Sequence, residues 1–217
     1  SRRRKPFTRT EQSGRGANSI YTHIIVGGGT AGCVMASRLT EDPAVRLLVL
    51  EAGPPDTSRN IHFPALYYKL TGGPLTWGYR TAPSAQRDGY EMPFAQARVL
   101  GGGSSINGMV FVRGNSCDID EWEMSGASGW NYQSCLPYFK RLERWQGGES
   151  EFRGGSGPIG VSTGNDMQLS PLYQAFIDAG VEAGYPACPD YNGASQEGFG
   201  PMQMNVDKGI RASTAHA

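Results

Sequence analysis

The sequence predicts an α/β fold that opens with one parallel βαβ unit. Three observations predict it: an apolar run at residues 21–26, a glycine-rich loop at 27–32 that leads into a helical pattern, and a second apolar run at 46–51. Short apolar runs bounded by turn residues are typical of buried strands. Two strands separated by a helix of this length pair in parallel through a right-handed crossover.

Length and charge limit the class of protein. The chain has 217 residues, of which 18% are charged, and its formal net charge is zero. This length suits one sizeable domain, or one and a part, and the balanced charge speaks against a nucleic-acid partner. Glycine, at 31 residues, is about twice as frequent as in an average protein. We therefore expect many tight turns and a close backbone approach to a large ligand.

The first 19 residues precede the first strand and carry six basic side chains against one acidic side chain, Glu11. Their low apolar content predicts a disordered basic tail at residues 1–19. Such a composition is typical of mitochondrial transit peptides, and equally of a solvated tail. The chain has no apolar run of 18 residues, so we expect no transmembrane segment.

The four cysteines, Cys33, Cys117, Cys135 and Cys188, form no C-x-x-C pair and have no histidine nearby in the sequence. This scatter indicates neither a zinc site nor a disulfide framework, so we expect reduced cysteines and no metal. Cys33 follows the glycine loop at a helix start, where a thiolate is favoured, although a small buried packing residue is the simpler interpretation.

The glycine loop fits the spacing G-x-G-x-x-G with Gly27, Gly29 and Gly32. The pattern is weak alone, but here it follows a strand, opens a helix at Thr30 and Ala31, and has Glu51 at the end of the next strand. These features predict a dinucleotide site, with a pyrophosphate at the helix start and a ribose on Glu51. The alternative is a glycine-rich turn without a ligand.

The identity of the dinucleotide stays open at this point between NAD and FAD. An arginine just after the second strand would indicate a 2′-phosphate, but the sequence continues EAGPPD, which disfavours NADP. The stretch ARVLGGGSSINGMVFVRG, residues 97–114, holds a second glycine run. A nicotinamide enzyme has no need of one, whereas a flavin must be held at both ends.

This second stretch resembles the first signature of the glucose-methanol-choline (GMC) oxidoreductases. The matching positions are Arg98, Gly101, Gly102, Ser104, Ile106, Asn107, Phe111, Gly114 and Asp120. The resemblance implies FAD as the cofactor and spans nearly all of residues 21–217. It implies FAD contacts at Gly27, Gly29, Thr30, Ala31, Gly32, Glu51, Arg98, Val99, Gly102, Gly103, Asn107, Gly108, Met109 and Val110, with the segment 107–110 facing the isoalloxazine ring.

Some members of the family attach FAD through a histidine in this loop. The corresponding position here is Ile106. An apolar side chain cannot form that bond, so we expect noncovalent FAD.

Within the family the chain resembles the branch that oxidises choline, in stretches such as SRLTEDPAVRLLVLEAGP, GWNYQSCLPYF, NGASQEGFGPM and RASTA. This implies oxidation of choline to betaine aldehyde by hydride transfer to FAD, with a quinone or the respiratory chain as electron acceptor. It also implies peripheral association with the mitochondrial inner membrane, or a place in the cytoplasm or at the membrane periphery of a bacterium. Other alcohols (aryl, aliphatic or sugar) remain the alternative substrates.

The remainder of the chain predicts part of an α+β substrate domain. Helical patterns occur at residues 118–124, 131–144 and 170–186, and strand-like patterns at 152–162 and 197–206.

Caps and stripes support the helices. Asn131 and Ser170 are placed as N-caps, and Gly184 stops the last helix. We expect the stripe of Leu136, Tyr138 and Phe139, and the helical aromatics in general, to be core residues.

Trp77, in the loop before the second glycine run, is a candidate for binding a quaternary ammonium, since such cations prefer aromatic faces. A packing role is the alternative. His23, His62 and His216 are poor candidates for the base that alcohol oxidation needs. The resemblance places that base, a histidine, beyond residue 217, so no catalytic residue is assigned.

In terms of domains, we expect the FAD-binding domain at residues 20–160 and the start of the substrate-binding region at 161–217. Two parallel strands are too few for a doubly wound sheet. We therefore expect an N-terminal part of a longer enzyme, inactive alone. The alternative is a truncated product that only binds FAD or a partner.

Overall fold

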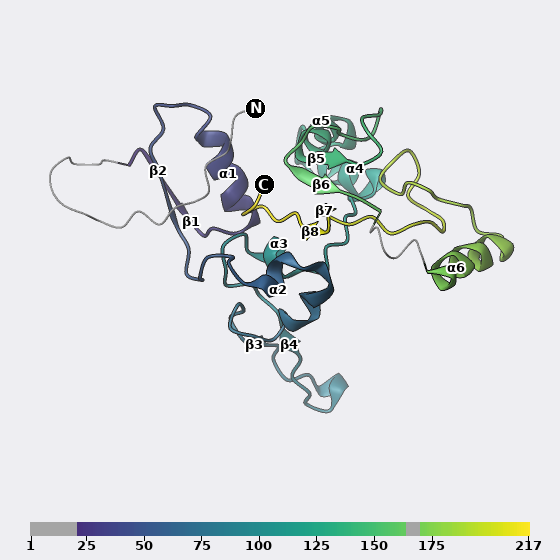
Figure 1. Ribbon diagram of the computed structural model, residues 1–217, viewed down its shortest axis with the longest axis horizontal. Coiled ribbons are helices and arrows are strands. Elements are labelled where there is room, and N and C mark those ends of the chain that lie inside the picture. Colours follow the sequence, from purple (N-terminus) through teal and green to yellow (C-terminus); the bar gives the residue numbers. More distant parts are fainter. Residues whose placement is uncertain (1–20, 164–169) are drawn as a thin grey trace.

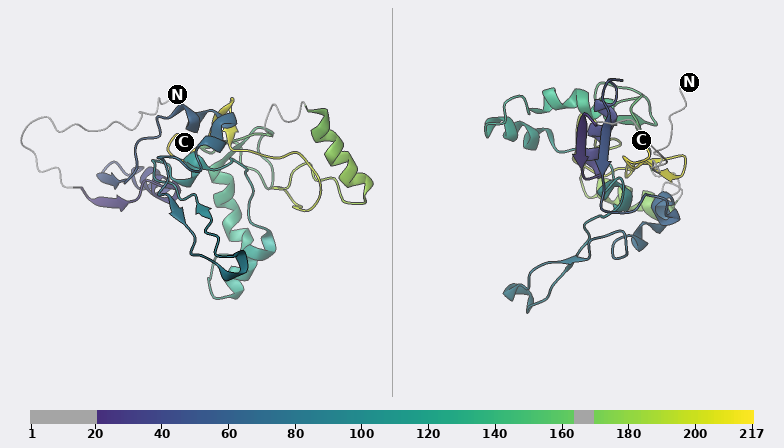
Figure 2. Two further views of the ribbon diagram at one scale, coloured as in Figure 1. Left: turned by 90° about the horizontal axis from the view of Figure 1, so that it is seen from below. Right: turned by 90° about the vertical axis from the view of Figure 1, so that its left-hand side faces the viewer.

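The computed structural model of the chain describes residues 21–163 and 170–217 (Figure 1). The tail predicted at residues 1–19 lies outside the described residues. The fold is an α/β arrangement of short elements around a small centre. Three parts extend from that centre: the unit of β1, α1 and β2, the hairpin of β3 and β4, and helix α6 (Figures 1 and 2).

The predicted βαβ unit is confirmed. It consists of β1 (His23–Val26), α1 (Thr30–Leu39) and β2 (Leu47–Leu50). The strands pair in parallel from His23 with Leu47 to Val26 with Leu50. The expectation of buried strands is wrong: Ile25 is buried, but Ile24 is 60% and Val26 84% exposed. Successive strand side chains point to opposite faces, and in this pair α1 packs against one of them.

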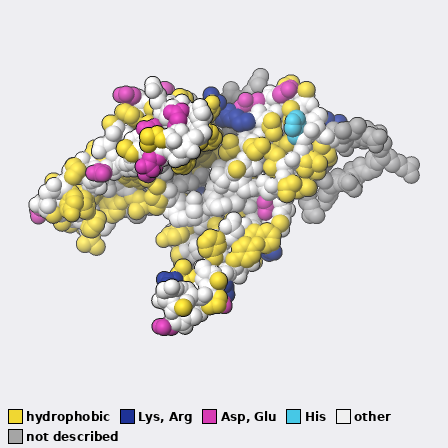
Figure 3. Space-filling view, turned by 180° about the vertical axis from the view of Figure 1, so that it is seen from behind, with side chains coloured by type: hydrophobic (Ala, Val, Ile, Leu, Met, Phe, Trp, Pro, Cys, Tyr) yellow, Lys and Arg dark blue, Asp and Glu magenta, His cyan; other side chains and the backbone are white. Residues whose placement is uncertain are grey.

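The segment between the glycine loops forms short helices and a projecting hairpin that the sequence did not predict. These elements are α2 (Arg59–His62), the 3-10 helix η1 (Pro64–Lys69), β3 (Tyr79–Arg80), the 3-10 helix η2 (Ala85–Arg87) and β4 (Pro93–Phe94). Strands β3 and β4 pair antiparallel. Apolar side chains cover much of this projecting hairpin (Figure 3), and Tyr79, Tyr90 and Phe94 are each more than half exposed.

The second layer contains α4 (Ser116–Met124), α5 (Tyr132–Leu142), β5 (Glu143–Trp145) and β6 (Ile159–Val161), with β5 and β6 parallel. Asn131 caps α5 as predicted, because its side chain accepts the Ser134 N–H. The helix expected over 131–144 ends two residues early. Glu143 joins a strand instead, where its carboxylate is fully buried and accepts the Gly154 N–H at 2.8 Å.

Helix α6 (Pro171–Glu182) begins after Ser170 and ends before Gly184, as predicted. Ser170 holds the N-cap position without a side-chain hydrogen bond. The strand expected at 197–206 is mostly extended chain with isolated bridges from Met204 to Val110 and to Ser162. The hairpin of β7 (Val206–Asp207) and β8 (Ile210–Arg211) follows.

The helical aromatics are not the core residues that the sequence suggested. Tyr138 is 65% exposed and Phe176 67%, and Trp122 is also exposed, whereas Leu136 and Phe139 are partly buried. The apolar core consists of two small clusters. One contains Ile61, Leu70, Val99 and Ile106, and the other Ile159, Val161 and Ala212.

A buried group of charges lies between β5 and the C-terminal part of the chain. The Glu143 carboxylate meets Arg153 Nε at 2.8 Å and Arg113 Nη2 at 2.9 Å. Arg153 Nη1 also lies 2.6 Å from Asp190 Oδ1. Each of these two arginines therefore has a carboxylate partner, which offsets the cost of burying its charge.

Within residues 21–163 and 170–217, no helix is long and apolar enough to cross a membrane. These ranges also contain no group of three or more potential metal ligands. The four cysteines are free, with Cys33 and Cys188 buried.

Candidate functional site

The first glycine loop joins β1 to α1 through a turn that needs two of its glycines. Gly27 has a φ of +100°, a left-handed conformation that favours glycine. At Gly32 a Cβ atom would lie 2.0 Å from the Gly27 carbonyl oxygen, so the helix could not approach the turn. Helix α1 has Gly29 as N-cap without a side-chain cap, which leaves N–H groups of its first turn available to a ligand.

Glu51, at the end of β2, is tied to the loop by both carboxylate oxygens. Oε2 accepts the Gly28 N–H at 2.7 Å, and Oε1 accepts the Gly53 N–H at 2.8 Å. The sequence predicted Glu51 as a ligand contact and did not predict this backbone role. Because each oxygen has a second lone pair, the fixed carboxylate can still accept a hydrogen bond from a ribose hydroxyl.

The second glycine loop packs directly on the first. The Gly101 N–H donates to the Gly28 carbonyl at 2.7 Å, and the Thr30 hydroxyl donates to the Gly101 carbonyl at 3.3 Å. Gly102 has a φ of +54°, and a Cβ there would lie 2.7 Å from the Gly29 Cα. Glycine at position 102 is therefore needed to bring the backbones of the two loops into contact.

A hollow of about 620 Å³ lies where the loops meet, a size typical of ligand sites. Its lining residues are Ile25, Val26, Gly27, Gly29, Thr30, Ala31, Gly32, Met35, Leu50, Glu51, Ala52, Trp77, Gln96, Ala97, Val99, Gly102 and Gly103. Nine of the predicted cofactor contacts are among them: Gly27, Gly29, Thr30, Ala31, Gly32, Glu51, Val99, Gly102 and Gly103. The lining residues at the ends of β1 and β2 were not predicted as site residues, nor were Met35, Gln96 and Ala97. No sequence motif marks their side chains.

The other predicted contacts lie outside this lining. They are Arg98, Asn107, Gly108, Met109 and Val110. The last four follow α3 (Gly103–Ile106), and the backbone of Met109 is left-handed, with a φ of +63°.

A sequence model of the GMC oxidoreductase family matches residues 21–217. The chain belongs to the GMC oxidoreductase family. An oxygen-dependent choline dehydrogenase of Photobacterium profundum is 57% identical over 201 residues, covering 92% of this chain and 35% of the relative. A mitochondrial choline dehydrogenase of Mus musculus is 47% identical over 205 residues, covering 91% of this chain and 34% of the relative. The chain thus spans about a third of the length of these relatives.

Solved structures of related proteins share the fold. The crystal structure of pyridoxine 4-oxidase from Mesorbium loti superimposes with a TM-score of 0.85 at 35% identity. The match covers 91% of this chain and 39% of the oxidase chain. The fold of this chain is therefore shared with a solved oxidase structure.

Trp77 lines the hollow of this GMC oxidoreductase, and its ring already has two neighbours. The Arg98 guanidinium lies over its ring at 5.5 Å, and the Tyr79 ring is stacked with it at 6.1 Å. A quaternary ammonium would need an open face. The position of Trp77 favours a role as part of the wall of the hollow, and its role in substrate binding remains a prediction.

Cys33 and the histidines occupy structural positions. Burial raises the pKa of the Cys33 thiol, which donates to the Gly28 carbonyl at 3.3 Å, so the thiol stays protonated at neutral pH. His23 lies in β1 next to the Thr22 hydroxyl. His62 Nε2 lies 2.6 Å from the Asp56 carbonyl oxygen. The His62 and His216 ring centroids are 6.0 Å apart.

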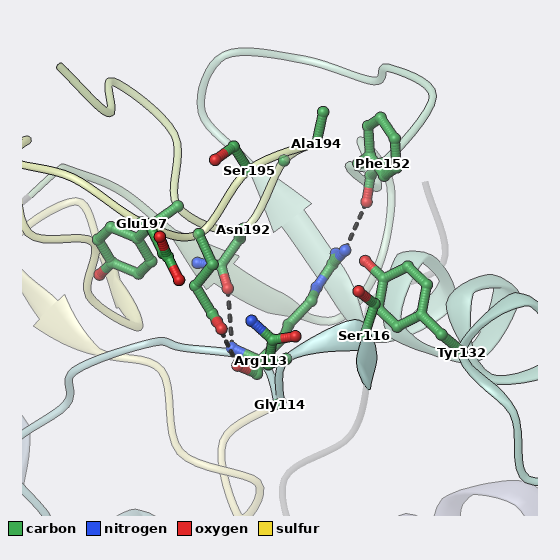
Figure 4. A pocket seen from close by; sticks show the side chains of 13 residues that line it. Arg113, Gly114, Ser116, Tyr132, Phe152, Asn192, Ala194, Ser195 and Glu197 are labelled. Atoms are coloured by element: carbon green, nitrogen blue, oxygen red, sulfur yellow. Dashed lines mark hydrogen bonds between the residues drawn. The ribbon is translucent and has the colours of Figure 1, made fainter. Parts of the chain in front are cut away.

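A second hollow, of about 370 Å³, lies near the buried charges (Figure 4). Its lining includes Arg113, Tyr132, Asn192 and Glu197 and none of the predicted cofactor contacts. Its hydrogen bonds are internal: the Arg113 N–H donates to Asn192, and the Gln196 amide donates to the Arg113 carbonyl. These bonds join residue 113 to the 192–197 loop.

Sequence reasoning missed the residues that hold the second loop from behind. Ser104 Oγ lies 2.9 Å from Thr214 Oγ1, and Arg211 Nη1 donates to Asn107. These pairs are 110 and 104 residues apart. The only local signal was the RASTA stretch, which was noted as part of the family resemblance without a role.

Proposed function

We propose that this chain forms the FAD-binding part of an oxidoreductase that oxidises an alcohol. The observation that carries the proposal is the backbone contact between the two glycine loops, which places Glu51 and the start of α1 around one hollow. A dinucleotide needs these features together: free N–H groups for the phosphates, a carboxylate for the ribose and glycine at the close approaches.

The residues fit FAD in two parts. Gly27, Gly29, Thr30, Ala31 and Gly32 would hold the pyrophosphate, and Glu51 the adenosine ribose. Val99, Gly102 and Gly103 form the opposite wall. The isoalloxazine ring would lie beyond this hollow, toward the segment from Asn107 to Val110. Arg98 would act through Trp77, which it covers.

Noncovalent attachment is supported by Ile106. This side chain is 4% exposed and packs with Ile61 and Val99 in an apolar cluster. It has no group able to bond to a flavin, and it points into protein.

When bound, FAD supplies an acceptor for a hydride. In the proposed reaction the alcohol C–H bond breaks, its hydrogen leaves as a hydride with two electrons, and the hydroxyl proton passes to a base. The product is an aldehyde. Within residues 21–163 and 170–217 no histidine has a place at the hollow, and we expect this base in a part of the enzyme corresponding to the remaining length of the relatives.

Choline is the proposed substrate, with betaine aldehyde as product, because two relatives at 57% and 47% identity are named choline dehydrogenases. Another alcohol is the alternative, since the 35%-identical pyridoxine 4-oxidase shares the fold. A quinone or the respiratory chain would take the electrons. Mitochondrial and bacterial relatives both occur, so we propose peripheral association with the inner mitochondrial membrane, with a bacterial location as the alternative.

The division into a cofactor part at residues 20–160 and a substrate part from 161 also remains a proposal. We expect residues 1–217 alone to bind FAD weakly and not to oxidise choline. Ile24 and Val26 illustrate why: both are more than half exposed on a two-stranded pair, which favours aggregation.

The experiment uses the protein expressed from its complete gene. It should purify with a flavin absorption spectrum and release free FAD into the supernatant on denaturation. Choline, but not benzyl alcohol or glucose, should bleach that flavin under anaerobic conditions. A protein without flavin would overturn the cofactor proposal. Flavin in the precipitated polypeptide would overturn noncovalent binding, and bleaching by another alcohol alone would overturn the choline assignment.

A further inference from the structure

Arg211, in β8, is the most completely buried cation that faces the second glycine loop. It is 1% exposed, it bonds to the backbone of α3, and it is not among the residues that line the hollow between the loops. Nη1 donates to the Ser104 carbonyl at 3.1 Å and to the Asn107 carbonyl and side-chain oxygen, both at 2.8 Å. Nε donates to the Ile61 carbonyl at 2.7 Å.

These bonds fix a segment that is not in a relaxed conformation. The Asn107 side-chain oxygen also accepts the Met109 N–H at 3.1 Å, so Arg211 and Met109 share one acceptor. Met109 is 1% exposed with a φ of +63°, a left-handed conformation that is uncommon for a residue with a Cβ. Arg211 therefore holds the first residue of a strained turn.

The chain after Arg211 reinforces the same loop. Thr214 N–H donates to Ser104 Oγ at 3.1 Å, and the two hydroxyl oxygens lie 2.9 Å apart. A Cβ at Gly101 would lie 3.0 Å from the Ala215 Cβ. Figure 1 shows this C-terminal segment passing α3 and reaching α1. The segment Arg211–Ala215 is thus a clamp behind the loop.

The groups that surround the charge of Arg211 differ from those around the other buried arginines. Its four acceptors are neutral oxygens, and the ion pairs found among residues 21–163 and 170–217 do not include it. Arg113 and Arg153, in contrast, share the Glu143 carboxylate. Burial lowers the pKa of Arg211 to about 10, so at neutral pH it still carries its proton. A positive charge without a carboxylate partner stabilises a negative charge that develops nearby in a region of low dielectric constant.

We infer that Arg211 is a positioning residue for the segment from Asn107 to Val110, and that its unneutralised charge favours the reduced, anionic form of a flavin bound against that segment. The inference rests on the proposed function, because it requires FAD at this loop. Arg211 acts here through the backbone and side chain of Asn107 and through its charge.

The test compares three variants of the protein expressed from its complete gene. Arg211→Met removes both the planar guanidinium group and the charge. Arg211→Lys keeps a positive charge but loses the guanidinium geometry. Asn107→Ala removes one acceptor and keeps the Arg211 cation. Arg153→Met is the matched control, because Arg153 is also 1% exposed but is bonded to the Glu143 and Asp190 carboxylates. For each variant the FAD dissociation constant and the midpoint potential of the bound flavin are measured.

We expect the FAD dissociation constant to rise about tenfold in Arg211→Lys, with a potential close to that of the parent protein. In Asn107→Ala, whose side chain belongs to the segment that would face the flavin, we expect a similar loss of affinity. In Arg211→Met we expect the same loss of affinity together with a more negative potential. Arg153→Met should melt at a lower temperature with an unchanged potential. If Arg211→Met does not accumulate as soluble protein, the lysine and alanine variants decide the positioning role.

Three results would overturn the inference while leaving FAD binding intact: parent-like FAD affinity in both Arg211→Lys and Asn107→Ala, a parent-like potential in Arg211→Met, or the same potential shift in Arg153→Met as in Arg211→Met. A parent protein that binds no FAD would instead overturn the proposed function, so the two failures are distinguishable.

Discussion

The two glycine loops use the same residue for different purposes. In the first loop Gly32 gives space to the loop's own turn, since a Cβ there would lie 2.0 Å from the Gly27 carbonyl oxygen. In the second, Gly102 gives space to the first loop, at 2.7 Å from the Gly29 Cα. Gly29 itself has only the Gly102 Cα near the position of a Cβ, at 3.9 Å. Close approach can therefore serve the fold, the contact between loops, or a ligand.

This comparison changes how glycine-rich motifs are interpreted. The sequence predicted that the second glycine run lies close to the cofactor, and the structure shows that the run also makes contacts within the protein. Ligand space is left at Gly29, where the protein itself sets no limit. Substitutions that separate the three purposes test the comparison, and those that disturb the fold have the largest expected effects.

Gly32→Ala should have the largest effect on stability. The new methyl group would overlap a backbone oxygen that cannot move without opening the β1 to α1 turn. We expect a loss of about 3 kcal/mol or more and little soluble protein. Soluble yield and melting temperature measure it. A parent-like melting temperature would show that the turn is more adaptable than its geometry indicates.

Gly102→Ala should come next. The methyl group would press on Gly29, and a φ of +54° with a ψ of −133° disfavours any residue with a Cβ. We expect about 2 kcal/mol of destabilisation and a separation of the two loops that weakens FAD binding. Melting temperature and FAD titration should change together. Lowered stability with unchanged FAD affinity would mean that loop contact does not shape the hollow.

Glu51→Gln should have a smaller effect on stability and a clear effect on the cofactor. A glutamine retains one acceptor, so either the Gly28 or the Gly53 N–H loses its partner, at about 1–3 kcal/mol. We also expect FAD affinity to fall roughly tenfold to a hundredfold, because the ribose loses a charged acceptor. Isothermal titration with FAD measures this, and a parent-like dissociation constant would remove Glu51 from the site.

Features set by neighbouring residues could be predicted from the sequence. The run from β1 to β2, the N-cap at Asn131 and the end of α6 before Gly184 each depend on a few adjacent positions. Among the lining residues of the hollow, Gly27, Gly29, Gly32 and Glu51 could be predicted from their spacing, whereas Val99, Gly102 and Gly103 were implied by the family resemblance.

Long-range features could not be predicted. Arg211 meets Asn107 across 104 residues, and although both positions belong to stretches that resemble the family, no local pattern indicates that they pair. Glu143 follows a helical pattern, but it enters β5 because its carboxylate is buried against Arg113 and Arg153. The exposure of Tyr138 shows a further limit, because a helical stripe predicts a packed face without showing what packs on it.

The central claim is that the space left at Gly29 is for the cofactor, and the most direct test is the FAD dissociation constant of Gly29→Ala beside that of Gly72→Ala. Gly72 is exposed, and a Cβ there would meet nothing within 4 Å, as against one atom at 3.9 Å for Gly29, but Gly72 lies away from the hollow. The free energy of unfolding of both variants should lie within about 1 kcal/mol of that of the parent protein. We predict that Gly29→Ala weakens FAD binding about tenfold or more, or about 1.4 kcal/mol, while Gly72→Ala leaves it unchanged. Equal dissociation constants for the two variants would contradict the claim.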